Sequence, residues 1–426
     1  MSTAFADPKR RVEVLSLKRT ANEHVSSSGS PRLHIGVAGP ATVREFAADL
    51  NEPGSTLPAG LSGTPVDHLV RAWLDDGHCV TLATLDRTVP VGESVTYTGP
   101  YLTIVVGPYR DRHRARDAFA VERRAIRDAL ARHRPNAVSA HWTYEFALGA
   151  IETGLPTIVT VHDVPKVIFS LQPSMYRLIR WGMHRRALAR ATGVVFNSPY
   201  TRQTLAHPQH TNAPVIPNAL PDSAWHLQER SAPDPSRPSF ISVNNGFGHR
   251  KNVQRLIKAF QLVRMAIPGA CLHLIGTGFE PGGTAHQWSR AHASEDGIEF
   301  QGPLEYRAVL DRVRAADVLV HPALEESFGY TLIEAASVGT PVIGGMASGA
   351  VPWVLADGAS GLLVDVTSSE LIAAAMRSLA SEPVRWRQLR LDAFEAGRKR
   401  FTASRIGRDY VDILEGISSA SPSRIG

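Results

Sequence analysis

Two glutamates near the C-terminal end of the chain, Glu326 and Glu334, stand eight residues apart and enclose a short apolar segment that contains a glycine. Carboxylates accept hydrogen bonds, which suits the hydroxyl groups of a sugar or a ribose. Between them the amides of Phe328 and Gly329 are expected at a helix start, where an anion such as phosphate is favoured. The segment therefore offers both halves of a binding site for a nucleotide-linked sugar.

The elements that must position these glutamates follow from the local pattern. The apolar run Val318–His321 predicts a strand, which places Glu326 in the loop at its carboxyl end and Glu334 inside the helix that follows. The segment 339–345, which begins Gly-Thr-Pro, predicts the end of that helix and the next strand. The alternative is a buried helix with two incidental glutamates, and an isolated pair at this spacing would favour it.

The longer string argues against that alternative. Residues 326–335 read E-S-F-G-Y-T-L-I-E-A, and G-T-P-V-I follows at 339–343. This combination resembles the family 4 glycosyltransferases, which are retaining enzymes of the GT-B fold, and the resemblance extends over about residues 33–415. It implies two tandem Rossmann-like domains facing a central cleft. A nucleoside diphosphate sugar, with UDP or GDP, would be a substrate, and no metal or other cofactor is implied.

The rest of the chain agrees with an α/β protein of two domains. Its 426 residues exceed one ordinary core, and 43% hydrophobic with 20% charged residues is a globular composition. Strand and helix patterns alternate, which is typical of parallel, doubly wound sheets. We predict a flexible tail over 1–30, an N-terminal Rossmann-like acceptor domain over 31–220, a polar linker over 221–238 and a C-terminal Rossmann-like nucleotide-sugar domain over 239–403. The resemblance adds that a helix within 404–426 returns to the first domain, with a tail after it.

Further site residues in the second domain come from the resemblance. Lys251 matches the family lysine that holds the diphosphate, and Arg250 beside it stands in for a family arginine that is missing near Asn244 and Asn245. Both are interpreted as catalytic, together with Glu326, which would bind hydroxyls of the donor sugar. The remaining candidates would bind the donor: Gly276, Gly278, Phe300, Phe328, Gly329, Tyr330, Thr331 and, for the ribose, Glu334.

In the first domain the resemblance centres on His162, which follows a predicted strand over Thr157–Val161. A side chain at the carboxyl end of such a strand lies where ligands bind in doubly wound folds, so His162 is expected against the donor sugar and the acceptor. A purely structural histidine is the alternative. His141 and Trp142, after the preceding strand, and Gly60, Ser62 and Gly63, in a loop that resembles the family's glycine-rich loop, are expected on the acceptor side.

Charge and cysteine content bear on partners and location. Net charge is +6, with nine Arg against four acids in 109–134 and five Arg without an acid in 176–190. These stretches either attract an anionic membrane surface or a phosphate-bearing acceptor, or are solvated helix faces. Cys79 and Cys271 are predicted as buried, reduced thiols. Neither a signal peptide, a membrane span nor a nucleic-acid-binding motif is recognised, so we expect a cytoplasmic enzyme, peripheral at most to the inner face of a membrane.

The sequence thus predicts a metal-independent, retaining hexosyltransferase that moves a sugar from a nucleoside diphosphate sugar to the hydroxyl of a saccharide or lipid-linked acceptor, in surface polysaccharide or glycolipid assembly. Three alternatives stay open. They are transfer to a small natural-product acceptor, a GT-B nucleotide-sugar 2-epimerase, and a two-domain binding protein of the periplasmic type.

Overall fold

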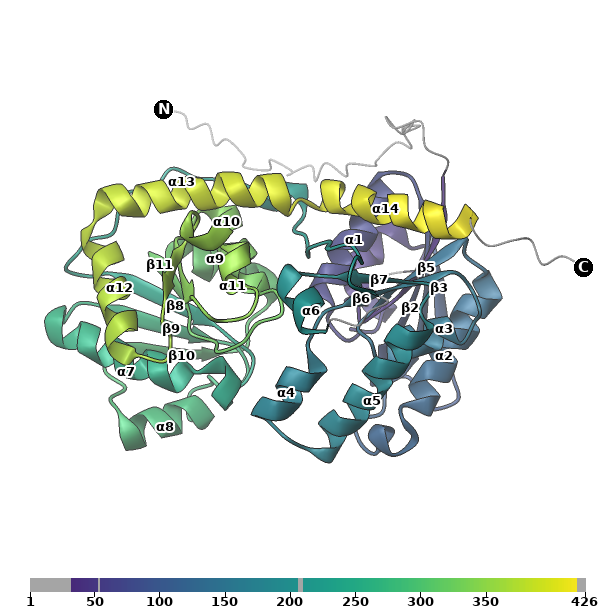
Figure 1. Ribbon diagram of the computed structural model, residues 1–426, viewed down its shortest axis with the longest axis horizontal. Helices are drawn as coiled ribbons and strands as arrows, with labels where there is room; N and C mark the ends of the chain where they lie inside the picture. The colour runs from purple at the N-terminus through teal and green to yellow at the C-terminus, as the bar shows by residue number, and fades with distance from the viewer. Residues whose placement is uncertain (1–31, 53, 206–209, 420–426) are drawn as a thin grey trace, which may run out of the picture. The chain divides into compact units, whose positions relative to one another are not determined.

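The computed structural model describes residues 32–52, 54–205 and 210–419. The tail predicted over 1–30 lies outside these residues, and so do residues 420–426 at the other end. Within the described ranges the chain builds two sheets one after the other, each flanked by helices (Figure 1). The predicted α/β architecture with two Rossmann-like halves is confirmed.

The first sheet has seven strands in the order β3-β4-β2-β1-β5-β6-β7. Their bounds are β1 His34–Ala38, β2 Cys79–Asp86, β3 Val95–Thr98, β4 Leu102–Pro108, β5 Ala137–His141, β6 Thr157–Val161 and β7 Gly193–Phe196. All neighbours pair in parallel except β3, which runs antiparallel to β4 at the edge of the sheet. The prediction of a parallel, doubly wound sheet is confirmed, and β3 adds one antiparallel strand at its edge. The reason for this orientation is that a short turn can join two strands only when they are antiparallel.

Strands β5 and β6 are buried at every position, which shows that helices of this half cover both faces of the sheet. The α-helices are α1 Thr64–Asp75, α2 Ala120–His133, α3 Glu145–Ile151, α4 Pro165–Leu171, α5 Met175–Arg190 and α6 Pro199–Thr204. The 3₁₀ helices are η1 Val43–Asp49, η2 Gly54–Thr56, η3 Arg114–Asp117 and η5 Asp222–Ala224.

The stretch 109–134, for which a solvated helix face was one alternative, is not one continuous helix. Ala118 and Phe119 adopt left-handed backbone angles, with φ of 49° and 60°, so η3 ends before α2 begins. Arg110 stabilises this break because its guanidinium pairs with Asp117 at 2.8 Å and with the fully buried Glu122 at 2.6 Å.

The second sheet has six strands in the order β10-β9-β8-β11-β12-β13, all paired in parallel. The strands are β8 Ser239–Val243, β9 Cys271–Ile275, β10 Ile298–Gly302, β11 Val318–His321, β12 Val342–Gly345 and β13 Leu362–Val364. The helices are η6 His249–Lys251, α7 Val253–Ala266, α8 Thr284–His292, α9 Tyr306–Ala315, α10 Tyr330–Val338, α11 Val351–Val354, η7 Ala356–Gly358, α12 Ser369–Ser381, α13 Pro383–Arg400 and α14 Ala403–Ser419.

The segment predicted as a linker is held against the second half of the molecule. Trp225 is 8% exposed, and its ring contacts Phe394 of α13 edge-on, at 6.1 Å between centroids. The amide of His226 also donates to the carbonyl of Ser337 in α10, at 3.2 Å. The exact domain boundaries stay a prediction. This stretch is anchored at Trp225 and His226, while many of its other residues are exposed.

The last described helix, α14, lies along α1 and β5 of the first half (Figure 1). Its buried side chains recur with helical spacing, as expected for an amphipathic helix on a core: Ala403, Ile406, Tyr410, Val411 and Leu414. The indole nitrogen of Trp73 in α1 donates to the carbonyl of Gly407 at 3.0 Å, which ties the two helices together.

Two expectations about the chain concern cysteines and the membrane. Cys79 and Cys271 are free thiols, but both are partly exposed, so the prediction of buried thiols was wrong. Each stands at the first position of its strand, where cover from neighbouring helices is incomplete. In the described ranges, none of the helices combines the length and the apolarity that crossing a bilayer requires.

Candidate active site

Glu334 lies on α10, where it is 5% exposed. Burial raises the pKa of its carboxyl to about 7, because the ionised form loses its hydration, and the nearby Tyr306 hydroxyl opposes that shift only in part. A carboxylate that is costly to keep ionised without a ligand gains most from hydroxyl donors that replace the missing water. This is the behaviour expected of a group that binds a ribose.

A cavity of about 770 Å³ opens beside Glu334 and is lined by residues of both sheets, which belong to one unit that begins at Arg32. Five residues predicted from the sequence line it: Ser62, Gly276, Tyr330, Thr331 and Glu334. Its volume falls in the range of sites for nucleotide-sized ligands. The structure therefore brings part of the predicted donor site together with the loop that follows η2.

Two glycines, one lining the cavity and one beside its lining residues Ser62 and Thr64, allow close backbone contacts. Gly276, which directly follows β9, has φ of 118°, and a Cβ there would lie 1.9 Å from the carbonyl oxygen of Asn244. A Cβ on Gly63 would lie 1.7 Å from the carbonyl oxygen of Pro40. Any side chain at either position would displace the adjacent backbone.

A hydrogen-bond bridge crosses the cavity between α1 and α10. The Tyr330 hydroxyl donates to the carbonyl of Ala219 at 2.8 Å and lies 2.7 Å from Nδ1 of His68. Burial lowers the pKa of His68 to about 4, so the imidazole is neutral near pH 7. The bridge fixes α1 of the first half against the helix that carries Glu334.

Glu326 is in a different state from Glu334, although both carboxylates are buried. Its Oε1 pairs with the ammonium of Lys251 and lies 3.5 Å from Nε2 of His321. Burial alone would raise the pKa of Glu326, but the charge of Lys251, with His321 and Arg250, lowers it well below the usual value. Glu326 is therefore ionised, and the structure places it in direct contact with the lysine predicted to hold the diphosphate.

Arg250 is directed elsewhere. Its guanidinium donates to the carbonyl of Glu325 at 3.1 Å and to the carboxylate of the same residue at 3.2 Å. Burial raises the pKa of Glu325, while Arg250 favours its ionised form. Arg250 thus orders the loop before Glu326, and its predicted contact with phosphate stays a prediction.

His162 lies between two other predicted residues, His141 and Trp142. The ring of Trp142 stacks on it at 4.2 Å between centroids, and a ring nitrogen of His141 lies 2.9 Å from Nε2 of His162. Burial, together with His141, lowers the pKa of His162 well below its usual value, so both imidazoles are neutral near pH 7. A neutral His162 is suited to orienting a hydroxyl by hydrogen bonding.

The loop that carries Glu326 is fastened beside His162 by two hydrogen bonds between the halves of the molecule. The hydroxyl of Ser327 donates to the carbonyl of His162 at 2.5 Å, and the hydroxyl of Ser198 donates to the carbonyl of Ser327 at 2.6 Å. Residues far apart in the sequence thus meet at one place: His162, Lys251 and Glu326.

Several predicted residues face away from the cavity. Phe300 is 9% exposed and stacks on His286 at 4.6 Å, and Phe328 is 2% exposed within an apolar cluster. Their side chains are core residues, so only their backbone groups remain candidates for donor binding. Gly60 and Gly278 have positive φ in their turns, and neither lines the large cavity.

Three residues that line the large cavity were not predicted from the sequence. Asp67 and His68 of α1 and Tyr306 of α9 all line the large cavity. Burial raises the pKa of Asp67 to about 6, although the amide of Thr42 donates to its carboxylate at 3.0 Å. The sequence did contain a signal for Asp67 and His68: both are polar residues in the first two turns of a helix that follows the predicted ligand-binding loop.

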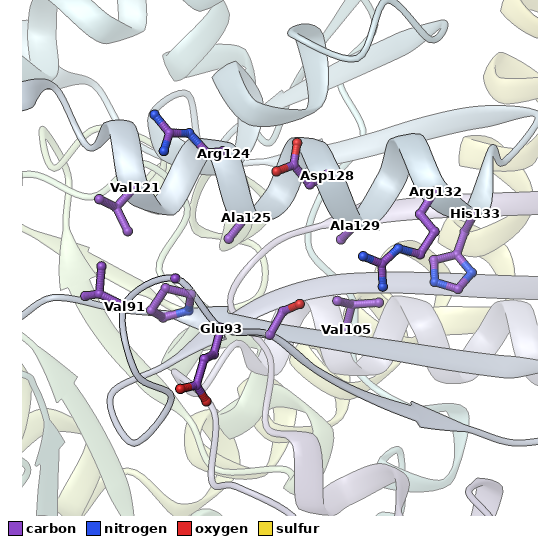
Figure 2. A pocket seen from close by; sticks show the side chains of 13 residues that line it. Val91, Glu93, Val105, Val121, Arg124, Ala125, Asp128, Ala129, Arg132 and His133 are labelled. Atoms are coloured by element: carbon purple, nitrogen blue, oxygen red, sulfur yellow. The ribbon is translucent and has the colours of Figure 1, made fainter.

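A further cavity, of about 260 Å³, lies outside this region (Figure 2). One wall is the face of α2 that carries Arg124, Asp128 and Arg132, and the other is formed by residues 91–94 together with Val105 of β4. None of the predicted site residues lines it, so the chemistry expected from the sequence does not involve this cavity.

The fold agrees with that of solved structures. Sucrose-phosphate synthase from Thermosynechococcus elongatus superposes with a TM-score of 0.73 at 19% identity, covering 92% of this chain and 100% of that one. Anabaena HepE in complex with UDP and glucose gives a TM-score of 0.62 at 14% identity, covering 90% and 100%. At such identities the likeness establishes the fold, and the predicted GT-B class is confirmed.

Family models identify the chain more closely. Residues 63–223 match the model for Glycosyltransferase Family 4, and residues 224–400 match the model for Glycosyl transferases group 1. The chain therefore belongs to the group 1 and family 4 retaining glycosyltransferases.

Curated relatives match over shorter stretches. The D-inositol 3-phosphate glycosyltransferase of Segniliparus rotundus is 34% identical over 158 residues, which cover 36% of this chain and 34% of the relative. The GDP-mannose-dependent monoacylated alpha-(1-6)-phosphatidylinositol monomannoside mannosyltransferase of Corynebacterium glutamicum is 29% identical over 155 residues, covering 34% and 39%. The chain spans well under half the length of both relatives.

Proposed function

We propose that this glycosyltransferase moves a hexosyl group from a UDP- or GDP-sugar to a hydroxyl of a saccharide or lipid-linked acceptor, in the assembly of surface polysaccharide or glycolipid. The observation that carries the proposal is the buried carboxyl of Glu334 on a cavity that both sheets line. In this proposal Glu334 binds the ribose, and Gly276, Tyr330 and Thr331 surround the nucleotide.

The reacting end of the donor lies near Glu326 and Lys251. Glu326 accepts hydrogen bonds from hydroxyls of the sugar, while Lys251 and the amides of Phe328 and Gly329 stabilise charge on the diphosphate. In the transfer step the bond from the anomeric carbon to the phosphate oxygen breaks, and a bond to the acceptor oxygen forms. The acceptor proton passes to the leaving phosphate, and retention follows if both events occur on one face of the sugar. Preorganised donors at the leaving group are the principal source of rate enhancement here.

His162 orients the sugar and the attacking hydroxyl in this proposal. Its neutral ring, held by Trp142 and His141, can accept or donate a hydrogen bond without adding a charge beside the positively charged sugar ring of the transition state. In the described part of the chain, no three His, Cys, Asp or Glu side chains are grouped closely enough to hold a metal ion. The metal independence of the reaction stays a prediction.

The acceptor is proposed to reach the enzyme at a membrane surface. The printed names of the relatives include a phosphatidylinositol mannoside and an inositol phosphate. On α5, Met175 and Leu178 are 69% and 42% exposed beside the arginines of 176–190. Exposed apolar side chains among cations suit an anionic bilayer surface. We expect co-sedimentation with anionic vesicles that weakens steeply as salt rises, and no binding at low salt would remove the membrane proposal alone.

The donor is tested by thermal stabilisation with UDP, GDP and their sugars. A ligand at 100 times its dissociation constant stabilises the folded state by about 2.7 kcal/mol. The base and sugar that stabilise most are then incubated with candidate acceptors, and the anomeric configuration of the product is read by NMR. A product with inverted C2 and no acceptor would favour the 2-epimerase, whereas ligand retention without turnover would favour a binding protein.

A further inference from the structure

A smaller cavity, of about 180 Å³, lies next to the predicted catalytic residues. Asp163, which directly follows His162, forms one part of its wall, and Arg250, which directly precedes Lys251, forms another. The remaining polar wall comes from Tyr144, Gln172, Tyr176, Arg177 and Arg180, and the last three of these belong to α5. The cavity is thus adjacent to the reaction centre, mostly on the side of the half predicted to hold the acceptor. We call it the α5 pocket.

Arg180 is held rigidly in the α5 pocket and keeps hydrogen-bond donors free for a ligand. Its guanidinium lies 3.6 Å above the ring of Tyr144. It donates to the Tyr176 hydroxyl at 3.3 Å, and it lies 3.8 Å from Asp163, which is beyond hydrogen-bond distance. A guanidinium has five N–H donors in a planar fork that matches phosphate oxygens, so these contacts leave several of its donors unused.

The charges around the pocket favour an anion. Arg177 donates to the carbonyl of Gln172 at 2.9 Å and to its side-chain oxygen at 2.6 Å, which are neutral partners, so the charge of Arg177 is not offset by them. The single proton of the Tyr144 hydroxyl is shared between the two carboxylate oxygens of Asp163, which lie 2.9 and 2.8 Å from it. The lining thus carries three guanidinium groups and one carboxylate, Asp163. Two further carboxylates act from outside the lining: Glu325 pairs with Arg250, and Glu145 acts on Arg180.

We propose that the α5 pocket binds the phosphate group of the acceptor, and that the acceptor is accordingly a phosphorylated polyol or sugar. This inference rests on the proposed glycosyl transfer and names the acceptor class for it. The pocket is smaller than sites for drug-sized ligands, so it suits a single ring or head group. With the phosphate between Arg177 and Arg180, the rest of the polyol extends past Asp163 toward His162. The phosphate can belong to a soluble polyol phosphate or to a lipid head group, since both present the same oxygens.

The test measures acceptor binding in the presence of saturating UDP or GDP, by calorimetry on the full chain. The probes are D-inositol 3-phosphate, unphosphorylated inositol, and vesicles with and without phosphatidylinositol. The variants are Arg177→Gln and Arg180→Gln. The matched control is Arg186→Gln, which removes the same charge from an exposed position of α5 that does not line the pocket.

We expect the phosphorylated probe to bind and inositol to bind at least tenfold more weakly. Each pocket variant should lose about tenfold to 100-fold in affinity for D-inositol 3-phosphate, as expected for a hydrogen bond to a charged group, while Arg186→Gln should leave the affinity for this soluble probe unchanged. Arg177→Gln keeps the test valid if loss of the partly buried Arg180 prevents folding. Binding to phosphatidylinositol vesicles alone, with the same dependence on Arg177, supports the lipid source.

Two results would overturn the inference. Equal binding of inositol and its phosphate, or equal losses in Arg177→Gln and Arg186→Gln, would exclude a phosphate site in the α5 pocket. Nucleotide binding without binding of any phosphorylated probe would also do so, and would leave the glycosyl transfer in place. A chain that binds neither UDP nor GDP would instead remove the proposed function, and the inference with it.

Discussion

The two regions that carry Glu326 and Glu334 belong to one short segment, yet they hold their carboxylates in opposite states. Glu326 lies in the loop before α10 against the ammonium of Lys251, which keeps it ionised by lowering its pKa well below the usual value. Glu334 lies inside α10, where burial raises its pKa to about 7. The group that acts against this shift is the uncharged hydroxyl of Tyr306. The surroundings thus give two glutamates of one segment different charge states.

From this difference in charge state we infer which ligand group each region would bind. An ionised carboxylate beside a lysine forms a fixed pair of acceptor and donor, which suits a sugar hydroxyl next to a phosphate. A desolvated carboxyl whose pKa lies near 7 can change its protonation state when a ligand enters the cavity. Changes to either region should therefore have different consequences for rate, affinity and pH dependence.

The largest effect is expected for Lys251→Ala. Loss of this ammonium removes charge stabilisation from the leaving diphosphate and leaves Glu326 buried without its partner, so transfer should slow by about 100-fold to 1000-fold. The turnover rate at saturating substrates measures it. Arg250→Ala is the comparison: because Arg250 is held by Glu325, its loss should cost less than about tenfold at saturating acceptor. Equal losses of turnover rate in Lys251→Ala and Arg250→Ala would show that Arg250 replaces the missing family arginine.

Replacing each glutamate separates the two tasks. Glu334→Ala should weaken the donor and the free nucleoside diphosphate together, whereas Glu326→Ala should leave nucleotide affinity nearly intact and reduce transfer. A hydrogen bond to a charged group contributes about 1.5–3 kcal/mol, so each change should cost between about tenfold and 150-fold. Calorimetry and initial rates give both values, and a reversed pattern would mean that the assigned roles are exchanged.

A smaller effect is expected from pH. Ribose hydroxyls favour the ionised form of Glu334, so the nucleotide should lower its pKa and release a proton on binding near pH 7. Affinity should then rise by about tenfold from pH 6 to pH 8 and level off above that. Calorimetry in buffers of different ionisation enthalpy detects the proton.

Glu334→Gln is the control for this pH dependence and should flatten it. Asp67, whose pKa burial raises to about 6, lines the same cavity and titrates in the same direction. Asp67→Asn should leave the dependence centred near pH 7 in place. If Asp67→Asn flattened the curve and Glu334→Gln did not, the titrating group would be Asp67.

The smallest effect is expected from EDTA. It should leave the transfer rates of the parent enzyme and of the variants unchanged, because cationic side chains and amides are proposed to hold the diphosphate. Transfer rates before and after chelation and dialysis provide the measurement. Loss of activity that Mg²⁺ restores would refute metal independence.

Local patterns in the sequence were sufficient to predict much of the fold. Strands β6 and β11 have the bounds expected from their apolar runs, and the loop position of Glu326 follows from the end of β11. Edge strand β3 was not predicted, because its four residues are only partly buried and give little periodic signal. Apolar periodicity reports burial, so elements with full burial were predicted best.

The candidate site was predicted in its residue types but not in its pairings. The prediction that Glu326, Lys251 and His162 belong to a site followed from motifs: His162 directly follows β6, Glu326 lies in the loop after β11, and Lys251 lies just before α7. That Lys251 would contact Glu326, that Arg250 would turn to Glu325, and that Arg177 and Arg180 would face Asp163 depends on contacts between distant segments. Protonation depends on the same contacts, because desolvation and neighbouring charge exist only once the chain is folded. The sequence by itself determined which chemistry is available, and the tertiary structure decided which groups meet and in which charge state.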